Sequence, residues 1–187
     1  YPGDCPIIYM AAFHSLMQVL PVPNYETKWF RGLGFCQARR RNHMVEQAIE
    51  WGADLIVSLD IDQVYPPDIL QRLVARTEQG YRCVSALFPC RGRTDSLARP
   101  FDPSGWKLVD KHFTQIDLTE ADDDGMIQAE FPTTACNIMH AEDVAKLSRP
   151  WYAYKYNPET WEETEGEDSR FYLRLGQEVG VKCYVDT

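Results

Sequence analysis

Three features are absent or scarce in this sequence, and each argues against one class of protein or site. No stretch reaches the ~20 consecutive apolar residues of a membrane-spanning helix, so no membrane span is predicted. Basic residues are few: 19 Lys and Arg stand against 28 Asp and Glu. The resulting net charge of −9 disfavours nucleic-acid binding, which needs a basic surface. None of the six cysteines belongs to a Cys-x-x-Cys pair, so a structural zinc site is not expected.

Cysteine usage also bears on the compartment. Cys83, Cys136 and Cys183 lie in apolar segments, where a thiol behaves as a small hydrophobic side chain. This pattern favours a reducing compartment, and we expect a cytoplasmic protein. The start of the chain, which is Tyr1 and not Met, contains no visible signal peptide. With 187 residues and 44% hydrophobic residues, the chain is predicted to form a single globular domain over residues 1–187.

Hydrophobic periodicity predicts alternating strands and helices. Strands are expected at residues 6–12, 55–59, 82–88, 134–139 and 181–185, and helices at 39–51, 68–77, 141–147 and 169–179. Weaker patterns at 106–109 and 113–118 predict a small hairpin insertion. Because the connections are long enough to return the chain, this order predicts an α/β fold. Its sheet is expected to be Rossmann-like and mostly parallel, with flanking helices.

The segment 54–70 is the most informative part of the sequence. A short apolar run ends in two carboxylates, Asp60 and Asp62, before Pro66-Pro67-Asp68 opens the next helix. Ligands of open α/β sheets collect beyond the carboxyl ends of the strands. Two acids are costly to desolvate there, and a divalent cation compensates them well. The alternative is a pair of solvated loop acids, with Asp68 as a helix cap.

Two further polar clusters accompany this pair. Arg39-Arg40-Arg41-Asn42 opens a helix before it, and Glu167-Asp168 opens a late helix. In order and spacing, the three clusters resemble the GT-A-fold glycosyltransferases, which use nucleotide-sugar donors and carry an Asp-x-Asp element. The resemblance extends over about residues 6 to 186. The matching positions are Ala38, Arg41, Asn42 and Ala48 in the early helix, and Gly166, Glu167 and Asp168 in the late one.

The resemblance implies a GT-A-like fold and a metal-assisted, inverting transfer of a sugar. The donor would be a UDP- or GDP-sugar, and the acceptor a hydroxyl group of a glycan or another molecule. It implies that Asp60 and Asp62 contact the donor and bind Mn²⁺ or Mg²⁺. It also implies that Asp168, with Glu167 as the alternate, deprotonates the acceptor hydroxyl. The alternative for this acidic pair is complementation of a helix dipole.

Arg41 is a candidate donor-binding residue on its own chemistry, because an arginine at a helix start suits anions. Its alternative is an ordinary surface charge. In many relatives a third metal ligand, often His, follows the last strand, whereas this chain stops at Asp186-Thr187. Either that ligand was cut away or lost, or metal binding relies on Asp62 and water. His14 and His140 are candidate substitutes.

The segment 151–166 carries five aromatic residues and lacks a helical or strand period. Long segments of this kind are often functional. We therefore expect it to line the acceptor side and to close over bound donor and metal. The alternative for its rings is packing in the core.

Two other functions fit parts of the sequence. The run Asp60-Ile61-Asp62-Gln63-Val64 also fits the nucleophile strand of haloacid-dehalogenase-like phosphatases, with Asp60 as nucleophile and Asp62 as acid/base. That motif normally sits on the first strand, whereas a strand and a helix are predicted before it here. The third hypothesis is a non-catalytic glycan- or nucleotide-binding module, which the missing C-terminal ligand keeps open.

Overall fold

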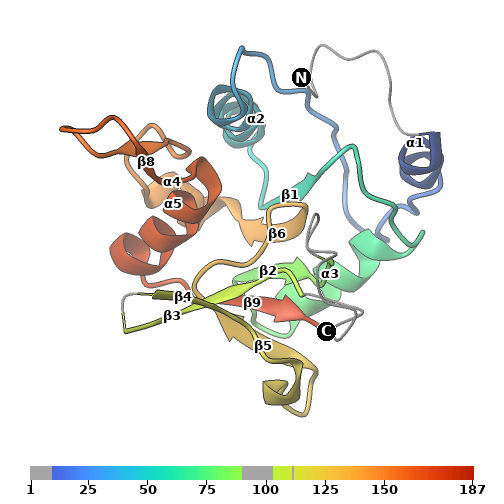
Figure 1. Ribbon diagram of the computed structural model, residues 1–187. Coiled ribbons are helices and arrows are strands. Elements are labelled where there is room, and N and C mark those ends of the chain that lie inside the picture. Colours follow the sequence, from blue (N-terminus) through green and yellow to red (C-terminus); the bar gives the residue numbers. More distant parts are fainter. Residues whose placement is uncertain (1–9, 90–102, 111) are drawn as a thin grey trace.

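The computed structural model describes residues 10–89, 103–110 and 112–187 (Figure 1). Its largest sheet has five strands in the order β1-β6-β2-β9-β5. These strands are β1 (Leu55–Leu59), β6 (Cys136–His140), β2 (Cys83–Ala86), β9 (Cys183–Asp186) and β5 (Met126–Ala129). Neighbouring strands pair antiparallel at β1–β6, β6–β2 and β9–β5, and parallel at β2–β9.

The predicted mostly parallel, Rossmann-like and GT-A-like sheet is therefore wrong, because antiparallel pairing dominates. Strands β1, β2 and β9 run in one direction, as expected, but β6 is inserted between β1 and β2 in the opposite direction. The sequence could not reveal this, since Cys136, Ile138 and Met139 are as apolar and as buried as residues of a central parallel strand. Burial determines which strands are central and says nothing about their direction.

The first predicted strand is also wrong where it can be judged. Residues 10–12 belong to helix α1 (Met10–Met17), and the rest of the segment 6–12 lies outside the described residues. The predicted helices are confirmed to within a few residues as α2 (Gln37–Trp51), α3 (Ile69–Glu78), α4 (Ala141–Lys146) and α5 (Glu167–Arg174). A π-helical turn, Leu175–Val179, continues α5. Gly52 ends α2 with a φ of 80°, which suits glycine.

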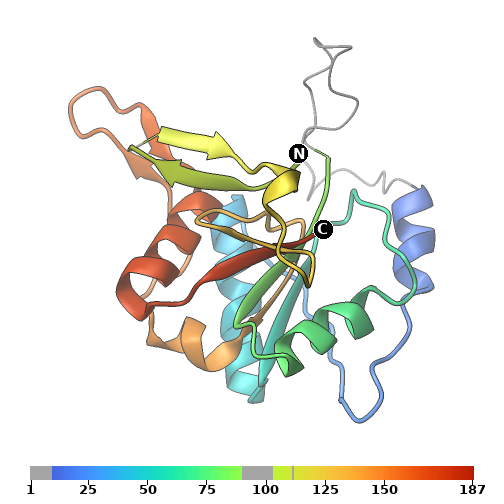
Figure 2. The same cartoon turned by 90° about the horizontal axis from the view of Figure 1, so that it is seen from below.

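Two hairpins stand beside the sheet. The predicted insertion is present as β3 (Trp106–Val109) and β4 (His112–Gln115). A second hairpin, β7 (Lys155–Tyr156) and β8 (Glu163–Glu165), lies within the segment 151–166, which was expected to have no strand. A short 3₁₀ turn, Leu118–Glu120, follows β4. Figure 2 shows β3–β4 beside α5, and Figure 1 places the two together as well.

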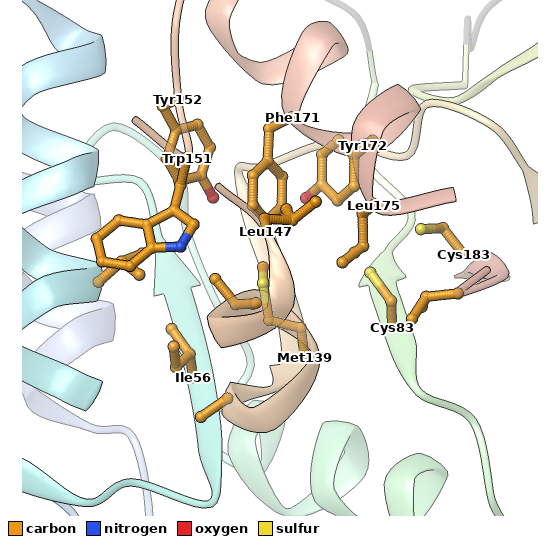
Figure 3. Close-up of a cluster of buried hydrophobic side chains, with 14 of the residues drawn as sticks. Ile56, Cys83, Met139, Leu147, Trp151, Tyr152, Phe171, Tyr172, Leu175 and Cys183 are labelled. Carbon is orange, nitrogen blue, oxygen red and sulfur yellow. The ribbon is translucent and has the colours of Figure 1, made fainter. Parts of the chain in front are cut away.

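Helices α2, α4 and α5 cover one face of the sheet, and α3 covers the other (Figures 1 and 2). On the first face, Ile56, Met139, Cys83 and Cys183 lie in one row across four strands. The rings of Tyr152 and Phe171 stack with their centroids 4.3 Å apart. Figure 3 shows both rings above this row. This row and these rings form the core that holds the start of α5 against the sheet.

The second face carries the predicted apolar stripe of α3. Ile69, Leu70, Leu73 and Val74 are buried there against Val84 and Ile138. At the rim, Arg76 Nη2 lies 2.7 Å from Asp186 Oδ1.

Across the described parts of the chain, no helix is both long enough and apolar enough to cross a membrane.

Replacement of Ile138 by Ala tests the central position of β6. Ile138 is fully buried and pairs with Val57 on one side and Val84 on the other. We expect Ile138→Ala to lower the free energy of unfolding by about 2–5 kcal/mol, because it leaves a cavity in the core. Val109→Ala is the matched control in an exposed strand, with an expected change within about 0.5 kcal/mol. Urea denaturation measures both, and equal small effects would contradict the central placement of β6.

Candidate functional site

The carboxyl end of β1 places Asp60 at the edge of the sheet, on the face covered by α2 and α5. Side chains alternate along a strand, so Asp60 follows Ser58, which shares a row with Asn137 and Ser85 on that face. The backbone N–H of Asp60 donates to the carbonyl of Ala135 at 2.8 Å. This bond continues the β1–β6 pairing to the end of the strand.

Tyr65 fixes the turn that follows. Its buried hydroxyl lies 2.7 Å from the carbonyl oxygen of Asp60 and 2.8 Å from that of Ala135. Burial, together with nearby Cys136 and Asp60, raises the pKa of this hydroxyl, so it remains a donor at neutral pH. The hydroxyl therefore ties the end of β1 to the segment that precedes β6.

Arg41 connects three parts of the chain from α2. Its Nη1 donates to Glu167 Oε1 at 2.8 Å, and its Nη2 donates to Thr134 Oγ1 at 2.7 Å. The same Nη1 lies 3.7 Å from Asp168 Oδ2. Burial would lower the pKa of the guanidinium, but Tyr152, Asp168, Glu167 and Asp60 outweigh that effect and raise it. Arg41 is therefore a fixed positive charge in a mostly acidic surrounding.

Glu167 and Asp168 occupy different environments although they are adjacent in the sequence. The side chain of Glu167 is 11% exposed, and burial raises its pKa against the opposing charge of Arg41. Its carboxylate also accepts a hydrogen bond from the hydroxyl of Tyr154. The side chain of Asp168 is 30% exposed, and its Oδ1 accepts from Ser169 N at 2.8 Å. Of the two acids, Asp168 offers the accessible carboxylate.

The predicted residues meet in one pocket of about 710 Å³. Arg41, Asp60, Asp62 and Asp168 all line it, and Glu167 lies behind Arg41. Asp60 and Asp62, which follow β1, are 106 or more positions away from Asp168 in the sequence, so only the fold brings them together. The remaining lining residues are Gln63, Phe88, Pro89, Ser104, Trp106, Phe113, Gln115, Thr133, Thr134 and Ala135.

The pocket fits a divalent cation only in part. Asp60 and Asp62 supply hard oxygen ligands on the same wall. Among residues 10–89, 103–110 and 112–187, no group of three or more His, Cys, Asp or Glu side chains is arranged to hold a metal. Mg²⁺ in particular is often bound through one or two carboxylates plus the phosphates of a substrate. The pair therefore fits a cation whose coordination the substrate completes.

The candidate third ligands do not join the pocket. His140 ends β6, whereas Thr134 and Ala135, which line the pocket, precede the other end of that strand. His14 belongs to α1 and is not among the lining residues. The carboxylate of Asp186 is engaged by Arg76 on the opposite face of the sheet.

Thr133, Thr134 and Ala135 line the pocket but were not predicted as site residues. The fixed geometry of this segment is set by Ser85 Oγ, which donates to the carbonyl of Thr133 at 2.6 Å, and by Arg41, which bonds Thr134. The run Thr-Thr-Ala at the start of the predicted strand 134–139 was the available signal. It becomes informative only once β6 is known to run antiparallel, because the start of β6 then lies beside the end of β1.

The aromatic segment 151–166 does not line the pocket. Trp151 and Tyr152 are buried in the core, as the packing alternative held, whereas Trp161 is 78% exposed. The pocket instead receives Phe88, Trp106 and Phe113, which come from the end of β2 and from the β3–β4 hairpin. The expectation that this segment closes over a bound donor stays a prediction.

No protein-family model and no curated protein matches the chain. Among solved structures, the chain is similar to the crystal structure of A197 from STIV, with a TM-score of 0.53 and 16% sequence identity. The similarity covers 81% of this chain, which spans 64% of the length of that structure. At this identity, the comparison concerns the fold alone.

The raised pKa of Glu167 predicts a pH dependence of stability. A carboxyl whose pKa is higher in the folded than in the unfolded state makes its full contribution to the free energy of unfolding below its unfolded pKa, near 4.5. That contribution is lost as the pH rises through the folded pKa. We therefore expect the unfolding free energy of the wild type, relative to Glu167→Gln, to fall as the pH rises from about 4 to 7.

Glu178 provides a control of opposite sign. A hydrogen bond from Arg174 lowers the pKa of Glu178, so its contribution is present above pH 4.5 and is lost as the pH falls. Relative to Glu178→Gln, the wild type should therefore gain stability as the pH rises. Urea denaturation at several pH values measures both differences. A flat or rising difference for Glu167 would contradict a pKa that burial raises.

Proposed function

We propose that the protein is a metal-assisted glycosyltransferase, which moves a sugar from a nucleotide-sugar donor to an acceptor hydroxyl. The supporting observation is that Asp60, Asp62, Arg41 and Asp168 line a single pocket. The order and spacing of the three polar clusters, which resemble those of glycosyltransferases that use nucleotide-sugar donors, support the same reading. The fold similarity to A197 adds no functional argument, because it concerns the fold alone.

The donor side of the proposed site consists of Asp60, Asp62 and Arg41. Asp60 and Asp62 would hold Mn²⁺ or Mg²⁺, which when bound neutralises the negative charge of the leaving nucleoside diphosphate. Arg41 places a guanidinium on the same pocket, where it attracts the donor phosphates. Because Glu167 and Thr134 already hold two of its nitrogens, Arg41 needs no reorganisation when the donor arrives.

On the acceptor side of the proposed site, Asp168 is the general base. Its carboxylate takes the proton of the acceptor hydroxyl as that oxygen forms a bond to the anomeric carbon of the donor sugar. The bond between the anomeric carbon and the diphosphate oxygen breaks, and its electron pair leaves with the nucleoside diphosphate. Asp168 suits this role better than Glu167, because Glu167 is buried and occupied by Arg41 and Tyr154.

The phosphatase hypothesis was disfavoured because its motif normally sits on the first strand, and a strand was predicted before Asp60. The strand that was expected before β1 is helical at residues 10–12, so β1 is the first strand of the described residues. The two reactions differ in product, and assays separate them. A glycosyltransferase releases UDP or GDP from a nucleotide-sugar in the presence of Mn²⁺. A phosphatase releases inorganic phosphate from p-nitrophenyl phosphate, and that result without nucleotide release would replace the proposal.

Asp62→Asn should weaken Mn²⁺-dependent nucleotide binding and leave the fold intact. Asp62 lines the pocket beyond the end of β1, so its charge serves a ligand more than the core. Titration calorimetry with UDP and with GDP, each with and without Mn²⁺, measures the effect. Asp68→Asn is the control, since Asp68 is exposed in the same segment and does not line the pocket. Unchanged metal-dependent binding in Asp62→Asn would show that the metal assignment is wrong.

Asp168→Asn should slow transfer more than it weakens donor binding. A general base acts in the transition state, so its loss should reduce kcat by roughly 10²-fold or more and change donor affinity little. Steady-state rates of UDP or GDP release, combined with calorimetry of the same nucleotide, separate the two effects. A matching loss of donor affinity would instead place Asp168 at the nucleotide.

A further inference from the structure

One face of the β3–β4 hairpin is turned toward the pocket. The register pairs Trp106 with Gln115 and Leu108 with Phe113, so these four side chains share a face. Three of them, Trp106, Phe113 and Gln115, line the pocket. The opposite face carries Lys107, which is paired with Glu120. The hairpin therefore presents two aromatic rings to the pocket.

The ring of Trp106 is held rigidly. Its backbone exchanges two hydrogen bonds with Phe131, at 2.9 Å and 3.1 Å, and its indole stacks on the ring of Phe131 with a centroid distance of 5.0 Å and an interplanar angle of 17°. The ring of Phe131 in turn lies beside the buried ring of Tyr172, with a centroid distance of 6.0 Å. A preorganised ring binds a ligand without first losing its own freedom.

The same contacts place the rings on the side of the proposed base. Tyr172 lies on α5 four residues after Asp168, so both project from the same side of that helix. Figures 1 and 2 both show the hairpin beside α5. Asp60 and Asp62, by contrast, come from the end of β1. The hairpin therefore adjoins the acceptor side of the pocket.

The chemistry of this wall matches a saccharide. The C–H bonds of a pyranose form an apolar face that packs on an aromatic ring, while its hydroxyl groups need polar partners around the edge. Trp106 and Phe113 supply the rings, and Phe113 is 46% exposed. Asp168 lines the same pocket and supplies a carboxylate that is 30% exposed. Few precisely placed polar groups among aromatic walls are typical of small-ligand sites.

We propose that the acceptor is a saccharide, which stacks on Trp106 and Phe113 of the β3–β4 hairpin while its hydroxyl group faces Asp168. This inference rests on the proposed function, because it names the acceptor of that reaction. It assigns the stacking role to the hairpin and not to the aromatic segment 151–166.

The test compares Phe113→Ala and Trp106→Ala with Trp29→Ala. Trp29 is an exposed ring that neither lines the pocket nor belongs to the segment 151–166, so it serves as the matched control. Each variant is checked for folding by circular dichroism. Phe113→Ala keeps the test valid if Trp106→Ala fails to fold, because Phe113 is the more exposed ring. The acceptor probes are the methyl glycosides of glucose, galactose, mannose and N-acetylglucosamine.

Two readouts decide the outcome. Saturation-transfer NMR without donor should detect a methyl glycoside on the wild type and on Trp29→Ala, and lose it on Phe113→Ala. In the presence of UDP- or GDP-sugar and Mn²⁺, the hairpin variants should raise the acceptor KM by about tenfold and leave nucleotide affinity unchanged. A parallel loss of nucleotide affinity would assign the rings to the nucleobase and overturn the inference. Unchanged glycoside binding in both hairpin variants would overturn it as well.

The NMR readout also separates this inference from the proposed function. Glycoside binding that depends on Phe113 in a protein that releases no nucleotide would support the hairpin as a saccharide site and refute the transferase. Nucleotide release that is insensitive to the hairpin variants at every acceptor concentration would leave the transferase standing and refute the saccharide wall.

Discussion

The ion pair between Arg41 and Glu167 is the interaction on which the pocket depends. It joins α2 to the start of α5, and the second bond of Arg41 joins both to the segment before β6. A buried pair of this kind gains little net stability, because desolvation offsets much of the attraction. Its value lies in geometry. With both partners fixed, Asp168 is held at the pocket wall, and the guanidinium of Arg41 faces the same space.

Strand direction is the second constraint, and it explains why the site forms where it does. Because β6 runs antiparallel to β1, its first residues lie beside the last residues of β1. The Asp60–Ala135 backbone bond and the hydroxyl of Tyr65 seal this junction. In a parallel arrangement, the start of β6 would lie at the opposite edge, and Thr134 could not bond Arg41. The error in the predicted fold is thus also the reason why this wall of the pocket was missed.

Much of the rest was accessible from the sequence. The helices α2 and α3 and the strand β1 follow from apolar periodicity and from stop signals such as Gly52, and each was predicted to within about two residues. The resemblance implied that Asp60, Asp62 and Asp168 act in one site, with Arg41 as a candidate donor-binding residue, and the structure has all four lining one pocket. Contacts between distant segments did not follow. Nothing local distinguishes Trp106, which faces the pocket, from Trp151, which packs in the core.

The adjacent acids of α5 show how a helix resolves an ambiguity that a sequence leaves open. Successive residues of a helix project about 100° apart, so Glu167 and Asp168 leave α5 in different directions, although both approach Nη1 of Arg41. Arg41 and Tyr154 hold Glu167 on the buried side, and Asp168 is thereby turned to the pocket. One turn later, Tyr172 occupies the side of Asp168 and supports Phe131, on which Trp106 stacks. A single helix face therefore orients the proposed base and, through two rings, the hairpin wall that would hold its substrate.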